Sequence, residues 1–259
     1  MHPYFSSEVN SSDIPSDNPI FQRTKKAYEL VAQNELGRVL EIGCGEGYGI
    51  PILLQKATSY VGVDKNGFLI SSLQNQNLPN TKFHKQYVPP LTEIETESVD
   101  SVVCFQVIEH VAEDELMLSE IKRVLKPGGK LYLTTPNAVK SVSRNPWHVR
   151  EYTSTSLNEL LKVLGSVDLV GIISDDKASE YYALSNTSTK KIVNFDVFNF
   201  SKWLPSALLY FPYEILNRFH RNQLWKKHPQ LVESISSENY LLTTESKNSL
   251  DLFATVIKE

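Results

Sequence analysis

Residues 38–47 read Arg-Val-Leu-Glu-Ile-Gly-Cys-Gly-Glu-Gly, and this stretch decides the fold. A short apolar run precedes three alternate glycines, and apolar residues then resume at helical spacing from Ile50. This order predicts a buried strand, a tight turn and a helix N-terminus, which is how α/β folds bind nucleotide-like cofactors. The turn is not the dinucleotide fingerprint Gly-x-Gly-x-x-Gly, because Tyr48 stands where its third glycine would be.

Two acids around this turn indicate which cofactor it suits. Glu41 lies two residues before the first glycine, where it would oppose a pyrophosphate and favour an ammonium group, directly or through water. A second predicted strand, at 59–63, ends in Asp64, which is placed to accept hydrogen bonds from both hydroxyls of an adenosine ribose. The glycines and the two acids therefore favour S-adenosylmethionine over NAD.

Four segments in this order carry a family resemblance. Leu-Glu-Ile-Gly-Cys-Gly-Glu-Gly-Tyr-Gly and Val-Gly-Val-Asp resemble class I S-adenosylmethionine-dependent methyltransferases. Residues 99–111 look like the fourth strand and following turn of that family, and 120–131 look like the helix and turn that enter its fifth strand. The resemblance runs from about Arg38 to Tyr152. It implies methyl transfer but no particular acceptor.

The cofactor is expected to contact the turns that follow the first four strands. Glycines there let the backbone approach a ligand without Cβ clashes. Where the family often has an Asp against the adenine amino group, this sequence has Gln86. Phe105 and Gln106 would wall the methionine end, although a structural role suits them equally well. The predicted cofactor residues are Glu41, Gly43, Cys44, Gly45, Gly47, Asp64, Lys65, Gln86, Tyr87, Phe105 and Gln106.

Two histidines are candidates for a general base. The family counterpart of His110 often lies near the transferred methyl, and imidazole can accept a proton near neutral pH. His148 belongs to Asn-Pro-Trp-His-Val-Arg-Glu-Tyr (145–152), which resembles a segment of bacterial methyltransferases, some of them linked to surface polysaccharide pathways. For His110 the alternative is a hydrogen-bonded turn histidine. No His/Cys/carboxylate cluster has metal-site spacing, so no catalytic metal is expected.

The acceptor is expected to lie on the same side of the sheet as these histidines. Asn137 leaves the fifth predicted strand toward that side, and Arg150 and Tyr152 follow in the 145–152 segment. These three residues are the predicted substrate contacts. Alternatively, Arg150 and Glu151 only pin the loop by ion pairing.

The composition narrows the class of protein. The chain has 259 residues, of which 41% are hydrophobic and 22% charged, as in ordinary globular proteins. A formal net charge of −4 argues against a nucleic-acid partner, which usually requires a basic surface. Two cysteines imply no disulfide framework, which favours a reducing cytoplasm. We expect no signal peptide and no transmembrane segment.

The pattern of elements predicts a Rossmann-like α/β fold. Strands are expected near 38–42, 59–63, 81–84, 100–104, 129–135, 167–174 and 250–257, with helices between most of them. This gives a doubly wound, mostly parallel, seven-stranded sheet with a helical insertion before the last strand. The predicted divisions are a flexible arm at 1–19, the cofactor-binding core at 20–175, the insertion at 176–248 and the last strand at 249–259.

The insertion is expected to be helical at 190–200 and at 208–227, and it leaves several roles open. It could pack on its own core, cover the pocket as a lid, form a homodimer contact or dock a lipid-linked substrate. The expected function is methyl transfer from S-adenosylmethionine to a small-molecule or glycan/lipid-linked acceptor, at oxygen. One alternative is a non-catalytic S-adenosylmethionine-binding partner protein. An NAD-dependent dehydrogenase is a weaker alternative, because the glycine spacing and Glu41 disfavour it.

Overall fold

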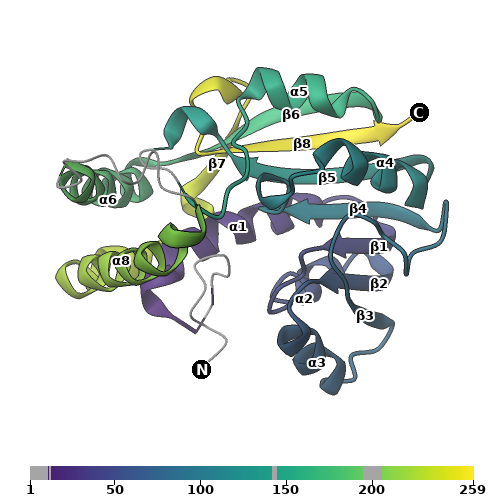
Figure 1. The fold of residues 1–259 in the computed structure, drawn as a ribbon, viewed down its shortest axis with the longest axis horizontal. Coiled ribbons are helices and arrows are strands. Elements are labelled where there is room, and N and C mark those ends of the chain that lie inside the picture. Colours follow the sequence, from purple (N-terminus) through teal and green to yellow (C-terminus); the bar gives the residue numbers. More distant parts are fainter. Residues whose placement is uncertain (1–10, 12, 142–144, 195–205) are drawn as a thin grey trace.

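The computed structural model describes residues 11, 13–141, 145–194 and 206–259, built around an eight-stranded sheet (Figure 1). The strand order is β3-β2-β1-β4-β5-β8-β6-β7. The neighbours from β3 to β5 are parallel, whereas β8 is antiparallel to both β5 and β6. The strands are β1 Gly37–Ile42, β2 Ala57–Asp64, β3 Thr81–Lys85, β4 Val99–Phe105, β5 Leu125–Pro136, β6 Gly165–Ser174, β7 Tyr240–Thr243 and β8 Asp251–Lys258.

The sheet confirms the Rossmann-like fold class and adds one strand to the seven expected. The additional strand, β7, pairs antiparallel with β6 at the edge of the sheet, from Gly171↔Thr243 to Ser174↔Tyr240. Its four residues lie in the segment that the sequence analysis treated as a mainly helical insertion. Tyr240 anchors the strand, because its side chain is fully buried and its hydroxyl donates to the Pro19 carbonyl at 2.6 Å.

Helices cover both faces of the sheet. Successive side chains of β1 point to opposite faces, and apolar side chains on both faces need cover. Leu40 and Ile42 face one apolar cluster with residues of α4 and α5, whereas Val39 faces another with residues of α1, α2 and α3. The helices are α1 Asn18–Val31, α2 Ile50–Leu53, α3 Gly67–Asn75, α4 Asp114–Val124, α5 Ser154–Leu161, α6 Asp176–Asn194, α8 Ser206–Lys227 and α9 Pro229–Ser234. None of the helices in the described ranges is both long enough and apolar enough to cross a bilayer.

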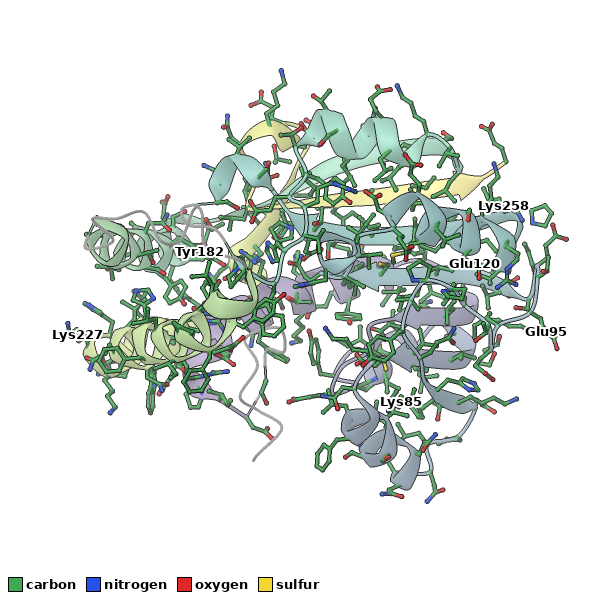
Figure 2. All side chains as sticks on the ribbon, in the orientation of Figure 1. Lys85, Glu95, Glu120, Tyr182, Lys227 and Lys258 are labelled. Carbon is green, nitrogen blue, oxygen red and sulfur yellow. The ribbon has the colours of Figure 1, made fainter. Side chains whose placement is uncertain are left out.

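Helices α6 and α8 lie together beyond one end of the sheet, where Figure 1 shows them at the left. Tyr182 and Lys227, labelled in Figure 2, mark the inner part of α6 and the far end of α8. The fully buried Asp17 accepts hydrogen bonds from Arg218 and Arg221 of α8, at 2.7 and 3.1 Å. The chain just before α1 is therefore fastened to the insertion. Residues 1–10 and 12 of the predicted arm lie outside the described residues.

Candidate active site

The glycine turn after β1 has a left-handed backbone. Gly43 and Gly45 have φ values of +77° and +53°, which suit glycine far better than other residues. A Cβ on Gly43 would lie 2.4 Å from Cγ2 of Val107, so the turn after β4 packs directly against it. A Cβ on Gly45 would meet no described atom within 4 Å. The turn is therefore closed on the Gly43 side and open at Gly45.

Asp64 is held in a fixed orientation at the end of β2. The Gly45 N–H donates to its Oδ2 at 2.9 Å, and the Asn66 N–H donates to its Oδ1 at 2.7 Å. Each carboxylate oxygen has a further lone pair. Asn66 also caps α3, since its side chain accepts from the Phe68 N–H at 3.1 Å. The carboxylate of Asp64 therefore lies beside the glycine turn, and both of its oxygens can accept a further hydrogen bond.

A cavity of about 360 Å³ opens at this edge of the sheet, over the ends of β1, β2 and β4. It brings together most of the predicted cofactor residues and one of the two histidines. The predicted residues that line it are Gly43, Cys44, Gly45, Asp64, Lys65, Gln86, Tyr87, Phe105, Gln106 and His110. Four turns far apart in the sequence thus form one binding surface.

Some residues of the cavity wall were absent from the sequence prediction. Thr24 and Tyr28 come from α1, and Tyr48 occupies the position that excluded the dinucleotide fingerprint. The α1 residues precede every recognisable motif, so no local signal distinguished them from ordinary helix residues. Asn66 was detectable in principle, because Asn before a helix is a typical N-cap.

Glu41 lies behind the cavity wall instead of in it. Its side chain is buried, and both carboxylate oxygens accept hydrogen bonds from tyrosine hydroxyls, those of Tyr28 and Tyr60. Burial raises the pKa of Glu41 to about 7. Because Tyr28 lines the cavity, its hydroxyl group connects this carboxyl group to the binding surface.

Gln86 has the one feature in the cavity that most resembles an adenine contact. Its Nε2 donates to the Pro90 carbonyl and to Thr92 Oγ1. Its Oε1 is buried, and no donor among the described residues reaches it. A buried acceptor without a donor is costly, and the exocyclic amino group of adenine would satisfy it. Tyr87 next to it is 72% exposed, which leaves its ring available to a ligand.

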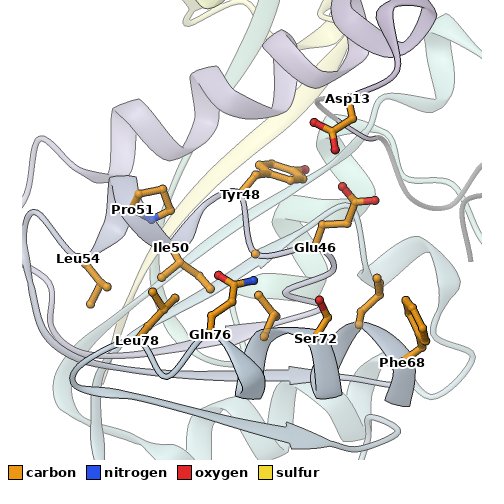
Figure 3. Close-up of a pocket in the computed structure, with 13 residues that line it drawn as sticks. Asp13, Glu46, Tyr48, Ile50, Pro51, Leu54, Phe68, Ser72, Gln76 and Leu78 are labelled. Carbon is orange, nitrogen blue, oxygen red and sulfur yellow. The ribbon is translucent and has the colours of Figure 1, made fainter.

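A second cavity, of about 550 Å³, lies on the other side of the glycine turn, between α2 and α3 (Figure 3). Gly47, predicted as a cofactor residue, lines this second cavity and not the first. Tyr48 contributes to both walls. Figure 3 shows Asp13 and Glu46 at one end and Leu54 and Leu78 at the other.

His110 and His148 lie edge to face, with their ring centroids 5.0 Å apart. Nδ1 of His110 is 3.0 Å from the Trp147 carbonyl oxygen, which can only accept, so Nδ1 carries the hydrogen. His148 contacts Glu151 Oε1 through Nδ1, at 2.9 Å, and the Asn145 side-chain nitrogen through Nε2, at 2.8 Å. His110 lines the cavity, whereas His148 stands behind it.

Glu109 completes this group. It is 1% exposed, and its Oε2 accepts a hydrogen bond of 3.0 Å from the Thr135 hydroxyl. Burial raises the pKa of Glu109 to about 7. It belongs to the short 3₁₀ turn Ile108–His110 that follows β4.

The three predicted substrate residues are not in the cavity wall. The side-chain amide of Asn137 is buried and donates to three carbonyls, those of residues 246, 247 and 249, at 3.0–3.1 Å. Arg150 pairs with Asp114, and the Tyr152 hydroxyl donates to the same carboxylate at 2.7 Å. Glu151 contacts Nδ1 of His148 at 2.9 Å, so Arg150 and Glu151 each have a charged or imidazole partner, as in the alternative that they pin the loop. These contacts fasten loops to the scaffold.

Comparisons with known proteins agree with this architecture. Residues 40–133 match the family described as methyltransferase domain. A probable S-adenosylmethionine-dependent methyltransferase of Mycolicibacterium smegmatis is 34% identical over 158 residues, 59% of this chain and 61% of the relative. One of Mycobacterium tuberculosis is 32% identical over 163 residues, 61% of this chain and 59% of the relative. The chain thus spans about three fifths of the length of these curated relatives.

Among solved structures, the fold is similar to that of a methyltransferase from Thermotoga maritima, titled a possible histamine N-methyltransferase. The TM-score is 0.56 at 14% identity, over 91% of that chain and 93% of this one. Together with the strand order, this likeness shows that the chain has the same fold as that S-adenosylmethionine-dependent methyltransferase.

Proposed function

We propose that this protein transfers a methyl group from S-adenosylmethionine to an oxygen of a small-molecule or glycan/lipid-linked acceptor. The observation that carries the proposal is the composition of the 360 Å³ cavity. It combines an open glycine turn, the oriented carboxylate of Asp64 and the unsatisfied acceptor of Gln86. A cofactor with an adenine, a ribose and an amino-acid end matches this set of groups in order along the sheet edge.

The cofactor would lie across the ends of β1, β2 and β4. Gln86 and Tyr87 would bind the adenine, and Asp64 would accept both ribose hydroxyls. The methionine end would pass Gly45 toward Tyr28, Phe105 and Gln106. The sulfonium is itself a reactive methyl donor, so the protein contributes mainly orientation, which can supply several kcal/mol of the barrier.

The acceptor would approach from the His110 side of the cavity. Since Nδ1 of His110 donates to a carbonyl, its neutral ring presents an acceptor at Nε2. A hydroxyl is a weak nucleophile unless its proton is drawn away, and this imidazole is suitably placed to take part. On α8, the side chains of Phe211, Ile215 and Phe219 are 52–71% exposed, which supports an acceptor with an apolar portion.

Calorimetry and turnover together test the proposal. We expect S-adenosylmethionine and S-adenosylhomocysteine to bind one per chain, and NAD to bind far more weakly. Formation of S-adenosylhomocysteine would then be followed against a panel of hydroxylated and lipid-linked acceptors. Tight NAD binding would favour the dehydrogenase alternative. Cofactor binding without turnover on any acceptor would favour a non-catalytic binding partner.

A further inference from the structure

We infer that Glu109, His110 and His148 bind one divalent transition-metal ion at the acceptor side of the cavity. Each of the three offers a ligand atom, and these atoms lie within 4.8 Å of one another. Glu109 and His110 come from the turn after β4, whereas His148 comes from the loop after β5. Because His148 is distant in sequence from the other two ligands, no local spacing motif indicates the site, and the sequence analysis predicted no metal.

The contacts around the two histidines are those that usually orient imidazole ligands. A metal-bound histidine typically donates its other ring N–H to a carbonyl or carboxylate. His110 directs Nδ1 to the Trp147 carbonyl, and His148 directs Nδ1 to Glu151. Nε2 of each ring would then be the coordinating atom. The Asn145 side-chain nitrogen is 2.8 Å from Nε2 of His148, so it is the group that a metal would displace.

Glu109 supplies an independent reason for a cation here. Its carboxyl group is buried, and within the described part of the chain no Lys or Arg forms a salt bridge with it. The Thr135 hydroxyl donates to one of its two oxygens. A buried carboxylate is costly unless it is paired with a cation or coordinates a metal. A metal ion next to the second oxygen would remove that cost.

The ligand set indicates the kind of ion and its use. Two imidazoles and one carboxylate favour first-row transition metals such as Zn²⁺, Co²⁺ or Mn²⁺ over Ca²⁺. Three protein ligands leave coordination positions open, as in catalytic metal sites. Since His110 lines the cavity, we expect the open side to face the acceptor. A bound cation would occupy Nε2 of His110, so it would replace this imidazole as the activating group and lower the pKa of the acceptor hydroxyl. This role rests on the proposed function, but the binding of the ion does not.

Metal titration of the chelator-treated protein tests the site directly. We expect one Co²⁺ per chain, detected by its visible absorption, and competition by Zn²⁺ in calorimetry. Glu109→Gln and His148→Ala should each weaken binding at least about 10-fold. His228→Ala, which removes a histidine outside the cluster, should leave binding unchanged. Glu151→Gln keeps all three ligands and should also weaken binding, so it serves if the other variants fail to fold.

Two results would overturn the inference. One is the absence of stoichiometric metal binding by the unmodified protein. The other is unchanged affinity in folded Glu109→Gln, His148→Ala and Glu151→Gln proteins. S-adenosylhomocysteine calorimetry on the same chelator-treated sample distinguishes a failure of the metal site from a failure of the proposed function. Cofactor binding without metal binding would refute only the metal site, and metal binding without cofactor binding would refute only the methyltransferase proposal.

Discussion

Asp64 is the side chain whose removal should affect the cofactor most. We expect Asp64→Ala to weaken S-adenosylhomocysteine binding by about 1–3 kcal/mol, roughly 5- to 150-fold, because two charge-assisted ribose hydrogen bonds disappear. Calorimetry measures the change. Asp168→Ala is the matched control, since Asp168 is exposed on β6 and does not line the cavity. Equal affinities in the two variants would remove Asp64 from the cofactor site.

Glu41 should make the stability of the protein depend on pH. Its pKa rises from 4.5 to about 7 in the folded protein, so between these values the folded state holds a proton that the unfolded state has lost. The contribution is therefore complete below pH 4.5 and is lost as the pH rises toward 7. We expect the free energy of unfolding to fall by up to roughly 1.4 kcal/mol per pH unit from this group.

Urea unfolding at pH 5, 6 and 7 checks this prediction. The decline should be smaller in Glu41→Gln, because glutamine cannot ionise. Glu109 also has a raised pKa and should keep part of the decline in that variant. Glu93→Gln is the control, since Glu93 is exposed. A decline in Glu41→Gln as steep as in the unmodified protein would show that Glu41 does not titrate in this window.

Single residues were predictable where a backbone requirement fixed them. Gly43 and Gly45 follow a strand and Asp64 ends the next one, and the ends of these strands must converge at one sheet edge, so their meeting could be expected from sequence alone. Tyr28 could not, because its contact with the cavity depends on how α1 packs. Asn137 was predicted to contact the substrate, but its side chain donates to carbonyls of a loop instead. A polar residue after a strand can serve either purpose, and the sequence does not distinguish them.

At the scale of elements, one contact joins the insertion to the candidate active site. Trp147 stacks on Tyr210 of α8, with centroids 4.0 Å apart and planes 9° apart, and its Nε1 donates to Glu214 at 2.6 Å. The Trp147 carbonyl also accepts the His110 hydrogen. Helix α8 therefore holds the loop that orients His110.

We expect Trp147→Ala to loosen the 145–152 loop while cofactor affinity stays within about threefold. Lost stacking and the lost indole hydrogen bond should cost roughly 2–4 kcal/mol of stability. Hydrogen exchange should quicken in 145–152, and turnover should fall. Trp225→Ala is a close control, because the Trp225 indole also donates to a glutamate, Glu233, at 2.8 Å. Faster exchange of 145–152 in both variants would indicate general destabilisation instead.

The helices and strands were largely predictable, because the spacing of apolar residues along the chain reflects which side of each element is buried. Each of the seven expected strands corresponds to a strand at nearly the same residues, and the predicted helix at 208–227 corresponds to α8. Strand β7 was missed, since Tyr-Leu-Leu-Thr is too short to show an alternation. Helix α6 begins at Asp176, earlier than the predicted helix at 190–200, of which 195–200 lie outside the described residues. Its polar sequence, with little helical apolar periodicity, gave no clear signal.

For the whole molecule, ligand binding should appear as added stability. A ligand that binds only the folded state adds RT ln(1 + [L]/Kd), about 2.7 kcal/mol at 100 times Kd. For a protein of this size that corresponds to a Tm increase of roughly 5–10 °C. We expect this increase with S-adenosylhomocysteine and little change with NAD at equal concentration. Differential scanning fluorimetry gives the ranking, and a larger increase with NAD would contradict the proposed cofactor.

The position of β8 has a consequence for synthesis on the ribosome. β8 lies between β5 and β6, so residues 165–174 cannot join the sheet until residues 251–258 have been translated and have left the exit tunnel. The strands and turns of the cofactor cavity are complete more than a hundred residues earlier, by Val111. The nascent chain would thus hold a formed nucleoside-binding half beside an unpaired edge of β5, and chaperones or early cofactor binding would act in that interval.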